Sequence, residues 1–396
     1  MIDIKDKNKN MCCGCTACAS ICPQKAIIMK EDFEGFKYPI VDKERCIDCG
    51  LCEKVCPVIH KIKEVEKSNC AYAIRCKDIE NLKDSTSGGF FIPFAKHIIN
   101  NDGIVYGVGY GNNFKVEHKR AEKIESIEEF KGSKYVQSDL NNIFIQVKKD
   151  LEENRIVLFS GTPCQIHGLK NYLQKEYSNL ITVDLICHGT PSPRLWQYYV
   201  EYQEKKYKSK ISKVNFRNKT YGYHCGTMKL EFKNSKRYFG SARIDYFLKS
   251  FFSEISSRPI CYDCKFKDVN HISDFTIYDC WHFKELSKSS KDDDKGYTNL
   301  IINTSKGIEY FKNIQNEYEF YEIDKFLAIK CDGIMVENSA IPHKNRKNFY
   351  KDLEALGIQK CIEKNIPISK TDYILEKFKV ILYKTKLLKF IQLIKR

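Results

Sequence analysis

Apolar positions between residues 85 and 155 change from helical to strand spacing and back. FFIPFAKHIIN (90–100) carries apolar side chains at helical spacing and predicts an amphipathic helix that an Asn-Asp-Gly turn ends. GIVYGVGY (103–110) is a nearly continuous apolar run and predicts a buried strand. KGSKYVQSD (131–139) predicts a loop, followed by a helix near 141–153. This succession is typical of an α/β domain.

Two strand–loop–helix units follow. RIVLFSGTPCQIHGLKNYL (155–173) reads as a strand, a glycine-proline loop and a helix. ITVDLICHGTPSP (181–193) reads as a second strand and a proline loop that starts a helix around 195–207. SDFTIYDCW (273–281) predicts another strand, and the polar stretch 287–296 predicts a mobile surface loop.

The two ends of the chain have different patterns. Near the start, AIIM and YPIV are short apolar stretches that suit two small strands beside cysteine-rich runs. Near the end, apolar residues recur at helical spacing between lysines. We therefore expect an α+β or α/β protein. A small domain at 1–65 precedes a larger mixed α/β domain made of regions 66–150 and 151–345, and a helical basic tail covers 346–396.

Composition narrows the class of protein. The chain has 396 residues, of which 42% are hydrophobic and 30% charged, an ordinary globular balance. No apolar run is long enough to span a membrane, and the polar N-terminus does not resemble a secretory signal. We therefore expect a cytoplasmic protein whose nineteen cysteines serve metal or redox chemistry rather than disulfides.

Two cysteine runs carry the strongest chemical signal. Residues 12–23 and 46–57 each contain C-x2-C-x2-C-x3-C-P. This is the spacing of bacterial ferredoxins with two 4Fe–4S clusters, in which the fourth cysteine of each run binds the other cluster. Zinc sites usually show one four-ligand set with a longer central gap, so the repeated run favours iron–sulfur clusters. We assign one cluster to Cys12, Cys15, Cys18 and Cys56 and the other to Cys46, Cys49, Cys52 and Cys22, which leaves Cys13 without a role.

Four further cysteines belong to the α/β region: Cys164, Cys187, Cys261 and Cys264. The first two lie in loops after predicted strands, where α/β folds usually place their sites. The last two form a C-x2-C pair. Four thiols are enough for a third cluster, but two buried bystanders and a stray pair explain the same spacing.

One glycine-rich stretch has the form of a phosphate loop. STSGGF (85–90) precedes a predicted helix, whose N-terminus suits a phosphate, although any capped helix start looks the same. Neither GxGxxG after a strand nor GxxxxGK[ST] occurs in the chain. The residues alone therefore identify no nucleotide.

Six motifs between about residues 70 and 305 resemble one known family: STSGGFF, KGSKYVQS, FSGTPCQIHGLK, CHGTPSPRLWQYY, CYDCKFK and SDFTIYDCW. With the cysteine-rich start, the chain resembles the family of the coenzyme F-420 hydrogenase/dehydrogenase beta subunit, in its bacterial form with an N-terminal dicluster ferredoxin domain. The resemblance implies a flavin, usually FAD, beside a 4Fe–4S cluster. It also implies that Cys164, Cys187, Cys261 and Cys264 hold this third cluster.

The resemblance further implies flavin contacts in the serine-glycine loop, in the lysine-glycine-serine loop and near the cysteine loops. The residues expected there are Ser87, Gly88, Gly89, Gly132, Ser133, Tyr135, Gly161, Thr162 and His188. One stretch departs from the family pattern, because YDCWH (278–282) stands where bacterial members have GDFWG. If that stretch borders the flavin, the shape of the site has changed. The sequence names no catalytic proton donor.

These expectations converge on an iron–sulfur flavoprotein oxidoreductase. It would pass electrons between a ferredoxin-like partner, the 4Fe–4S clusters, FAD and a substrate that the sequence does not identify. Some similar proteins occur among surface-polysaccharide genes, so the resemblance suggests a small-molecule or lipid-linked substrate rather than a deazaflavin. Two alternatives are an electron-transfer module that serves a partner protein and has no substrate of its own, and a basic zinc-cysteine protein that binds nucleic acid.

The formal net charge of +15 bears on the nucleic-acid alternative and on the role of the C-terminal tail. Three clusters and a flavin dinucleotide would lower the charge to roughly +7, so we expect no nucleic-acid partner. The last twenty residues hold seven Lys or Arg and no acidic residue. A basic amphipathic helix can lie on an anionic membrane, so peripheral contact with the inner face of the membrane is one expectation. A helix docked on the protein with extended lysines is the other.

Overall fold

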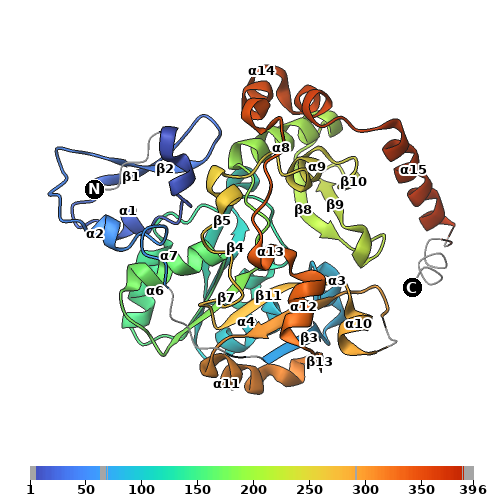
Figure 1. Cartoon of the computed structure of the whole chain (residues 1–396). Helices are drawn as coiled ribbons and strands as arrows, with labels where there is room; N and C mark the ends of the chain where they lie inside the picture. Colours follow the sequence, from blue (N-terminus) through green and yellow to red (C-terminus); the bar gives the residue numbers. More distant parts are fainter. Residues whose placement is uncertain (1–5, 63–67, 69, 290–291, 386, 388–396) are drawn as a thin grey trace.

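The computed structural model describes residues 6–62, 68, 70–289, 292–385 and 387. Three regions lie side by side in it: a cysteine-rich lobe drawn in blue, a large sheet with helices, and a smaller sheet with its own helices (Figure 1). The mixed α/β architecture with a small N-terminal domain confirms the predicted fold class.

The cysteine-rich lobe (residues 6–62) contains one hairpin and short helices. Strands β1 (Ile27–Glu31) and β2 (Lys37–Val41) pair antiparallel, as the two apolar stretches predict. Helices α1 (Ala17–Ile21) and α2 (Leu51–Lys54) each begin inside a cysteine run, after a residue with a positive φ. A 3-10 helix, η1 (Asp6–Met11), precedes them.

An eight-stranded mixed sheet forms the centre of the molecule, with the strand order β13-β3-β12-β11-β7-β6-β4-β5. Neighbours β11, β7, β6 and β4 are parallel, and the outer pairs are antiparallel. The strands are β3 (Cys70–Cys76), β4 (Ile104–Tyr110), β5 (Val116–Ala121), β6 (Val157–Gly161), β7 (Leu180–Leu185), β11 (Phe275–Cys280), β12 (Tyr297–Ile302) and β13 (Tyr318–Glu322). The four parallel strands confirm the four that the sequence predicts.

Alternation along the central strands divides the core between two faces of the sheet. Val157 and Phe159 of β6 pack with the helices α6 (Ile143–Glu152) and α7 (Pro163–Leu173) on one face. Leu158 points to the other face and packs with helix α4 (Phe91–Asn100). These three helices also confirm the sequence predictions. Helices α3 (Ile79–Asp84), α5 (Ile124–Ile127), α10 (Phe283–Ser287), α11 (Ser305–Ile314), α12 (Lys325–Asp332) and α13 (Ile334–Glu337) complete the region, with short 3-10 turns η2 (Asn112–Phe114), η3 (Glu128–Phe130) and η6 (Gln315–Glu317).

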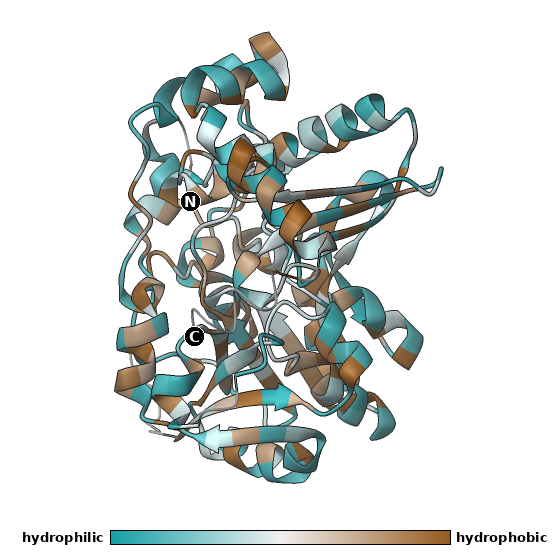
Figure 2. Ribbon diagram, turned by 90° about the vertical axis from the view of Figure 1, so that its right-hand side faces the viewer, coloured by the Kyte–Doolittle hydropathy of each residue, from teal (hydrophilic) through white to brown (hydrophobic). Residues whose placement is uncertain are grey.

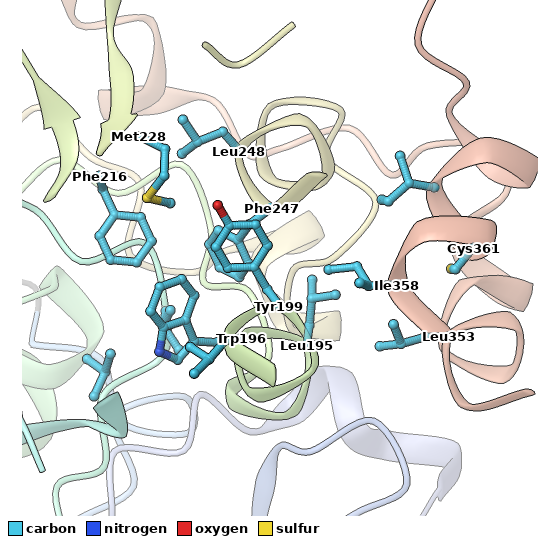
Figure 3. Packing of buried hydrophobic residues seen from close by; sticks show 14 of the residues in the cluster. Leu195, Trp196, Tyr199, Phe216, Met228, Phe247, Leu248, Leu353, Ile358 and Cys361 are labelled. Carbon is cyan, nitrogen blue, oxygen red and sulfur yellow. The ribbon is translucent and has the colours of Figure 1, made fainter. Parts of the chain in front are cut away.

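A second, three-stranded antiparallel sheet was not expected from the sequence. It has the order β10-β9-β8 and consists of β8 (Ile211–Asn218), β9 (Thr227–Phe232) and β10 (Arg237–Ser241). Helices α8 (Pro193–Tyr207), α9 (Tyr246–Phe252) and α14 (Arg346–Asn365) pack on it, around the fully buried Trp196 (Figure 3). Phe36 and Tyr38 of the cysteine-rich lobe belong to the same cluster. The lobe therefore shares a hydrophobic core with the rest of the protein.

The outer helices carry mixed hydropathy, with teal and brown turns alternating along them (Figure 2). Helix α15 (Lys370–Lys384) lies at the edge of the molecule and begins with a capping box at Ser369. Residues 386 and 388–396 of the predicted tail lie outside the described part of the chain. In the described part, no helix combines the length and the apolar character that crossing a membrane requires.

Candidate functional site: three cysteine cavities and two polar loops

Five of the lobe cysteines line one cavity, which we call the near cavity. They are the four of one predicted cluster set, Cys12, Cys15, Cys18 and Cys56, together with Cys13. The cavity has a volume of about 830 Å³, including space that is open to solvent. Cys56 comes from the second cysteine run and joins three cysteines of the first. This grouping is the one that the two-cluster spacing predicts.

The other four lobe cysteines line a second cavity, the outer cavity. They are Cys22, Cys46, Cys49 and Cys52, around about 400 Å³. Cys49 is exposed to solvent, and the neighbouring Ile47 is 61% exposed. Among the three cysteine cavities, this one has its ligands nearest to the molecular surface.

The third cavity, the inner cavity, lies where the parallel strands end. Its lining includes Cys164, Cys187, Cys261 and Cys264 around about 670 Å³. Strands β6 and β7 are parallel neighbours, so the segments that follow them emerge at the same edge of the sheet. Cys164 lies in the first turn of α7 rather than in the preceding loop, and the C-x2-C pair comes from the 3-10 helix η5 (Pro259–Asp263) and its end.

Polar groups already face the sulfurs of the inner cavity. The Gly189 N–H donates to Cys187 Sγ at 3.4 Å, and Thr190 Oγ1 lies 3.8 Å from Cys261 Sγ. Thr162 Oγ1 lies 3.1 Å from Cys164 Sγ. Such hydrogen bonds to sulfur are one of the means by which proteins set the potential of an iron–sulfur cluster.

Burial favours the protonated form of several thiols that line the near and inner cavities. It raises the pKa of Cys264 to about 12, with a further contribution from nearby Cys164. Burial likewise raises the pKa of Cys18 and of Cys187. A bound metal would instead favour the deprotonated thiolates, since thiolate is the ligand form and metal binding releases protons.

At least four thiols line each of the three cavities, a donor set that suits an iron–sulfur cluster, whereas a single zinc ion would need four of them to converge on one point. Within the described ranges, no three His, Cys, Asp or Glu side chains lie close enough together to hold a single metal ion.

Cys13 lies at the junction of two cavities, because it lines both the near and the inner cavity. The Cys15 thiol and burial raise the pKa of Cys13, whereas the Cys164 thiol, which belongs to the other set, lowers it. Sequence spacing assigned no role to this residue, and only the docking of the lobe on the sheet brings it beside Cys164.

Ion pairs hold the lobe against the rest of the protein. Arg346 binds both carboxylate oxygens of Glu34 at 2.8 and 2.6 Å, and Lys37 pairs with Asp139 at 2.5 Å. Gly168 of α7 lets the lobe approach closely, since a Cβ there would lie 2.7 Å from Cys15 Cβ. The near and inner cavities are therefore held in a fixed relation.

The two polar loops that the resemblance associates with a flavin lie next to each other. The Ser133 N–H donates to Thr86 Oγ1 at 2.8 Å and thereby joins the loops. Ser87 Oγ lies 2.7 Å from Thr298 Oγ1. A Cβ on Gly88 would approach Ile74 O at 2.1 Å, so this glycine allows the loop to pack on β3.

A buried arginine lies beside these loops. Arg217 Nη1 donates to Tyr135 Oη at 3.0 Å and to Asp279 at 3.3 Å, and the guanidinium lies 4.8 Å from the Trp281 ring. Its Nη2 is buried and has no hydrogen-bond partner among the described residues. Sequence patterns carried no signal for Arg217, because β8 was not predicted.

A chain of rings connects the loops to the inner cavity. Tyr135 stacks on Phe251 with centroids 4.5 Å apart, and Phe251 lies 6.5 Å from His188, which follows Cys187. Burial lowers the pKa of His188 to about 4. Of the other two residues expected at the flavin, Gly161 is the last residue of β6, and Thr162 lines the inner cavity.

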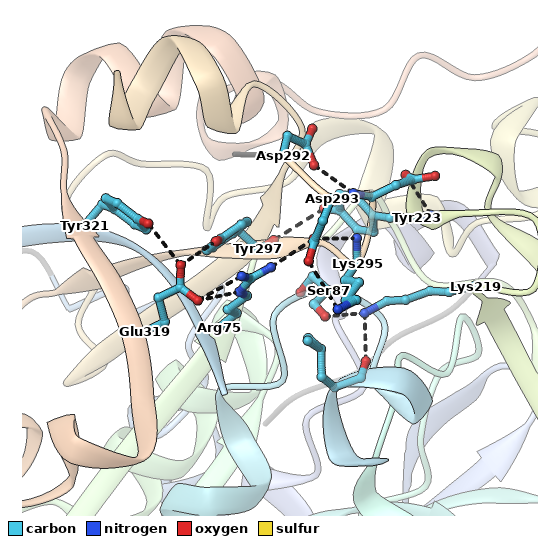
Figure 4. Close-up of polar contacts among 12 residues, drawn as sticks. Arg75, Ser87, Lys219, Tyr223, Asp292, Asp293, Lys295, Tyr297, Glu319 and Tyr321 are labelled. Carbon is cyan, nitrogen blue, oxygen red and sulfur yellow. Dashed lines mark hydrogen bonds and ion pairs between the residues drawn. The ribbon is translucent and has the colours of Figure 1, made fainter. Parts of the chain in front are cut away.

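A polar network supports the Ser87 loop from the outside (Figure 4). Lys219 Nζ donates to the Ser87 carbonyl at 2.5 Å, and burial lowers the Lys219 pKa to about 8. Arg75 joins Glu319 to Asp293, which belongs to the stretch expected to be mobile. The described part of that stretch is therefore tied to the sheet, while residues 290–291 lie outside the described residues.

Two parts of the chain match known protein families. Residues 154–325 match the family model for the C terminus of the coenzyme F420 hydrogenase/dehydrogenase beta subunit, and residues 11–59 match a 4Fe-4S dicluster domain. The chain is similar to the F subunit of the F(420)H(2) dehydrogenase of Methanosarcina mazei, with 24% identity over 343 residues, 83% of this chain and 89% of the relative.

A solved structure also shows a partial likeness. It is a chain of the F420-reducing [NiFe] hydrogenase complex from Methanosarcina barkeri, studied by xenon derivatization. The TM-score is 0.44 and the identity 17%, over 75% of this chain and 97% of that one.

Proposed function

Since residues 154–325 place this chain in the family of coenzyme F420 hydrogenase/dehydrogenase beta subunits and residues 11–59 add a 4Fe-4S dicluster domain, we propose that it is an iron–sulfur flavoprotein oxidoreductase with three 4Fe–4S clusters and one FAD. The observation that supports this most is that the twelve cysteines of the predicted cluster sets line three cavities, four at each, while Cys13 lines two of these cavities. The outer and near cavities would hold the dicluster pair, and the inner cavity the third cluster.

The order of the cavities gives a path through the protein. Electrons would enter at the outer cavity, where Cys49 is exposed, and a ferredoxin-like partner would dock there. They would then reach the near cavity, since the fourth cysteine of each run belongs to the other set. Cys13 lines both the near and the inner cavity, so the next step is short. The path can also run in reverse.

The two polar loops are the proposed flavin site. Ser87, Gly132, Ser133 and Tyr135 would contact the flavin, and Arg217 Nη2 offers it a buried donor that has no partner among the described residues. FAD exchanges two electrons with a substrate and single electrons with clusters, which is the chemistry that it would supply here. The ring contacts from Tyr135 through Phe251 to His188 would place the flavin beside the inner cavity.

The basic tail is proposed to contact an anionic membrane. Ile374, Phe378 and Ile381 of α15 are each more than half exposed, while Glu376 on the opposite side binds Ser241 Oγ. Removing residues 376–396 should abolish binding to vesicles of anionic lipid. Unchanged binding would rule out the membrane role.

A second candidate is an electron-transfer module that serves a partner protein. The relative from Methanosarcina mazei is named as one subunit of a dehydrogenase, which favours this candidate. The two candidates differ in whether the flavin reacts with a free small molecule.

Anaerobic purification and reconstitution test the proposal. We expect one flavin per chain, and a flavin that dithionite-reduced ferredoxin reduces through the clusters. Mixing the reduced protein with candidate acceptors, among them the deazaflavin and lipid-linked sugars, then tests for a substrate by reoxidation of the flavin spectrum. A protein that binds no flavin would contradict the proposal, whereas a flavin that only a partner protein reoxidises would favour the module.

A further inference from the structure

Arg258 is a buried cation at the boundary between the lobe and the α/β domain. It is 1% exposed and comes directly before Pro259 and the C-x2-C pair. Its Nε donates to the Cys12 carbonyl at 2.7 Å, and its Nη2 lies 3.5 Å from Cys12 Sγ. The same side chain lines the inner cavity. One guanidinium thus reaches both cysteine sets.

The contacts of this guanidinium are neutral groups. Besides Cys12, its partners are the Lys37 carbonyl at 2.9 Å and Gln137 Oε1 at 3.0 Å, and Tyr38 lies under the guanidinium at 4.1 Å from its ring centroid. In the described parts of the chain, Arg258 takes part in no ion pair with Asp or Glu. A buried charge without a counter-ion is costly, so an anion is expected beside it.

The cysteine sets supply that anion once they hold metal. A 4Fe–4S cluster with four thiolates carries a net charge of about −2 and becomes more negative by one when it takes up an electron. A fixed positive charge in a low-dielectric interior stabilises the reduced form more than the oxidised form. The step moves one electron and makes or breaks no bond.

We propose that Arg258 is a shared counter-cation that raises the reduction potentials at the near and inner cavities together. This inference rests on the proposed function, because it requires clusters in both cavities. Arg258 acts on both sites through its charge and exchanges no electron itself. Gln137, which also donates to the Cys13 carbonyl, holds the guanidinium in place.

The outer cavity provides an internal reference. Among the described residues, its lining contains Asp48 and no Lys, Arg or His. The potential there should therefore not depend on Arg258. The inner cavity has a second cation, Lys267, which donates to the Cys187 carbonyl at 2.6 Å.

The test is a redox titration of the reconstituted full chain, followed by EPR. Cys56→Ser and Cys264→Ser variants assign the signals of the near and inner cavities. In Arg258→Gln, both equilibria should shift at least tenfold toward the oxidised form, which is about 59 mV for a one-electron couple. The outer-cavity potential should not change. Arg258→Lys, which keeps the charge, should restore most of both potentials.

Arg346→Gln is the matched control. Arg346 is a partly buried arginine of the lobe interface, but it binds Glu34 and the Ser257 carbonyl and lines none of the three cavities. The loss of this arginine should weaken the docking of the lobe without shifting the potentials of the near and inner cavities together. Lys267→Met should lower the inner potential alone.

Three results would overturn the inference. The first is unchanged potentials in an Arg258→Gln protein with full iron content. The second is an equal shift of the potential at the outer cavity. The third is an Arg258→Lys protein with full iron content whose potentials fall as far as those expected for Arg258→Gln. If the Arg258→Gln protein does not take up iron, the potentials of the Arg258→Lys protein alone decide whether the inference holds. A wild-type chain without three clusters contradicts the proposed function instead, and the iron content measured first separates these cases.

Discussion

The cysteine-rich lobe and the inner cavity carry the same donor set, assembled in opposite ways. In the lobe, nine cysteines lie between residues 12 and 56, and the spacing of the two four-cysteine runs groups eight of them. In the inner cavity, four cysteines between residues 164 and 264 meet only because β6 and β7 are parallel neighbours and η5 folds over their ends. Local spacing defines the first site, and topology defines the second.

The two regions also differ in what stabilises them. Among the described residues, one hydrophobic cluster is formed by lobe side chains alone, and its buried members are Cys18 and Ile27. Phe36 and Tyr38 of the lobe instead pack into the core around Trp196. The lobe therefore depends on its metal and on docking, while the sheet has large cores on both faces. The inner cavity should persist when metal is absent, and the lobe should not.

Removing the metal should reveal the largest difference between the two regions. We expect hydrogen exchange of the metal-free protein to show lost protection throughout residues 12–56, because the clusters act as the staples of a small domain. Strands β6 and β7 should keep their protection. Equal loss of protection in both regions would show that the sheet also requires metal.

Shortening Phe36 should have the next largest effect. Phe36 is fully buried, and Phe36→Ala should cost about 3–5 kcal/mol of unfolding free energy in a denaturant titration of the anaerobic protein. Phe33→Ala is the control in the same hairpin, because Phe33 is 44% exposed. A cost below about 1 kcal/mol for Phe36→Ala would mean that the lobe does not rely on the shared core.

The lobe and the start of α9, which packs on the smaller sheet, should respond to pH in opposite directions. Burial raises the pKa of Asp245 to about 6, although hydrogen bonds from the Leu248 N–H, Tyr199 and Tyr238 lower it. A raised folded-state pKa adds stability below the unfolded value, and this stability is lost as the pH rises through about 6. The loss is on the order of 3 kcal/mol. In contrast, metal binding by the lobe thiols should strengthen as the pH rises.

Asp245→Asn tests the first half of this prediction. In metal-free protein, the variant should lose the fall in unfolding free energy between pH 4 and pH 6. An unchanged slope would assign the pH dependence to another group.

Adding a methyl group at Gly168, where the lobe approaches α7 closely, should give the smallest of these effects. The added Cβ would lie 2.9 Å from Cys15 Sγ, so Gly168→Ala should cost about 1–3 kcal/mol and weaken iron retention at the near cavity. Lys170→Ala, on the same helix but away from Cys15, should have little effect. A stabilisation by Gly168→Ala, as expected at an unconstrained helix position, would contradict the close docking of the lobe.

The contrast between the two regions also explains how much the sequence could predict. Eight of the nine lobe cysteines line two cavities in the sets that their local spacing predicts, although a bound cluster stays a prediction. The strands β4, β6, β7 and β11 were predicted because each is an apolar run between turns. The inner set could not be derived from spacing, since it depends on strand order, and its assignment came from the resemblance. Cys13 and Arg258 carried no signal, because their positions follow from docking of distant segments. The β8–β10 sheet was missed, since its half-buried strands contain many charged residues.

The central claim is that the inner cavity holds a cluster in addition to the two of the lobe. The most direct test is the content of iron and inorganic sulfide in reconstituted protein, compared with Cys264→Ser and with the control Cys361→Ser, whose buried thiol lines none of the three cavities. We expect about twelve irons in the wild type and in the control, and about eight in Cys264→Ser. Equal iron in all three proteins, or about eight in the wild type, would contradict the claim.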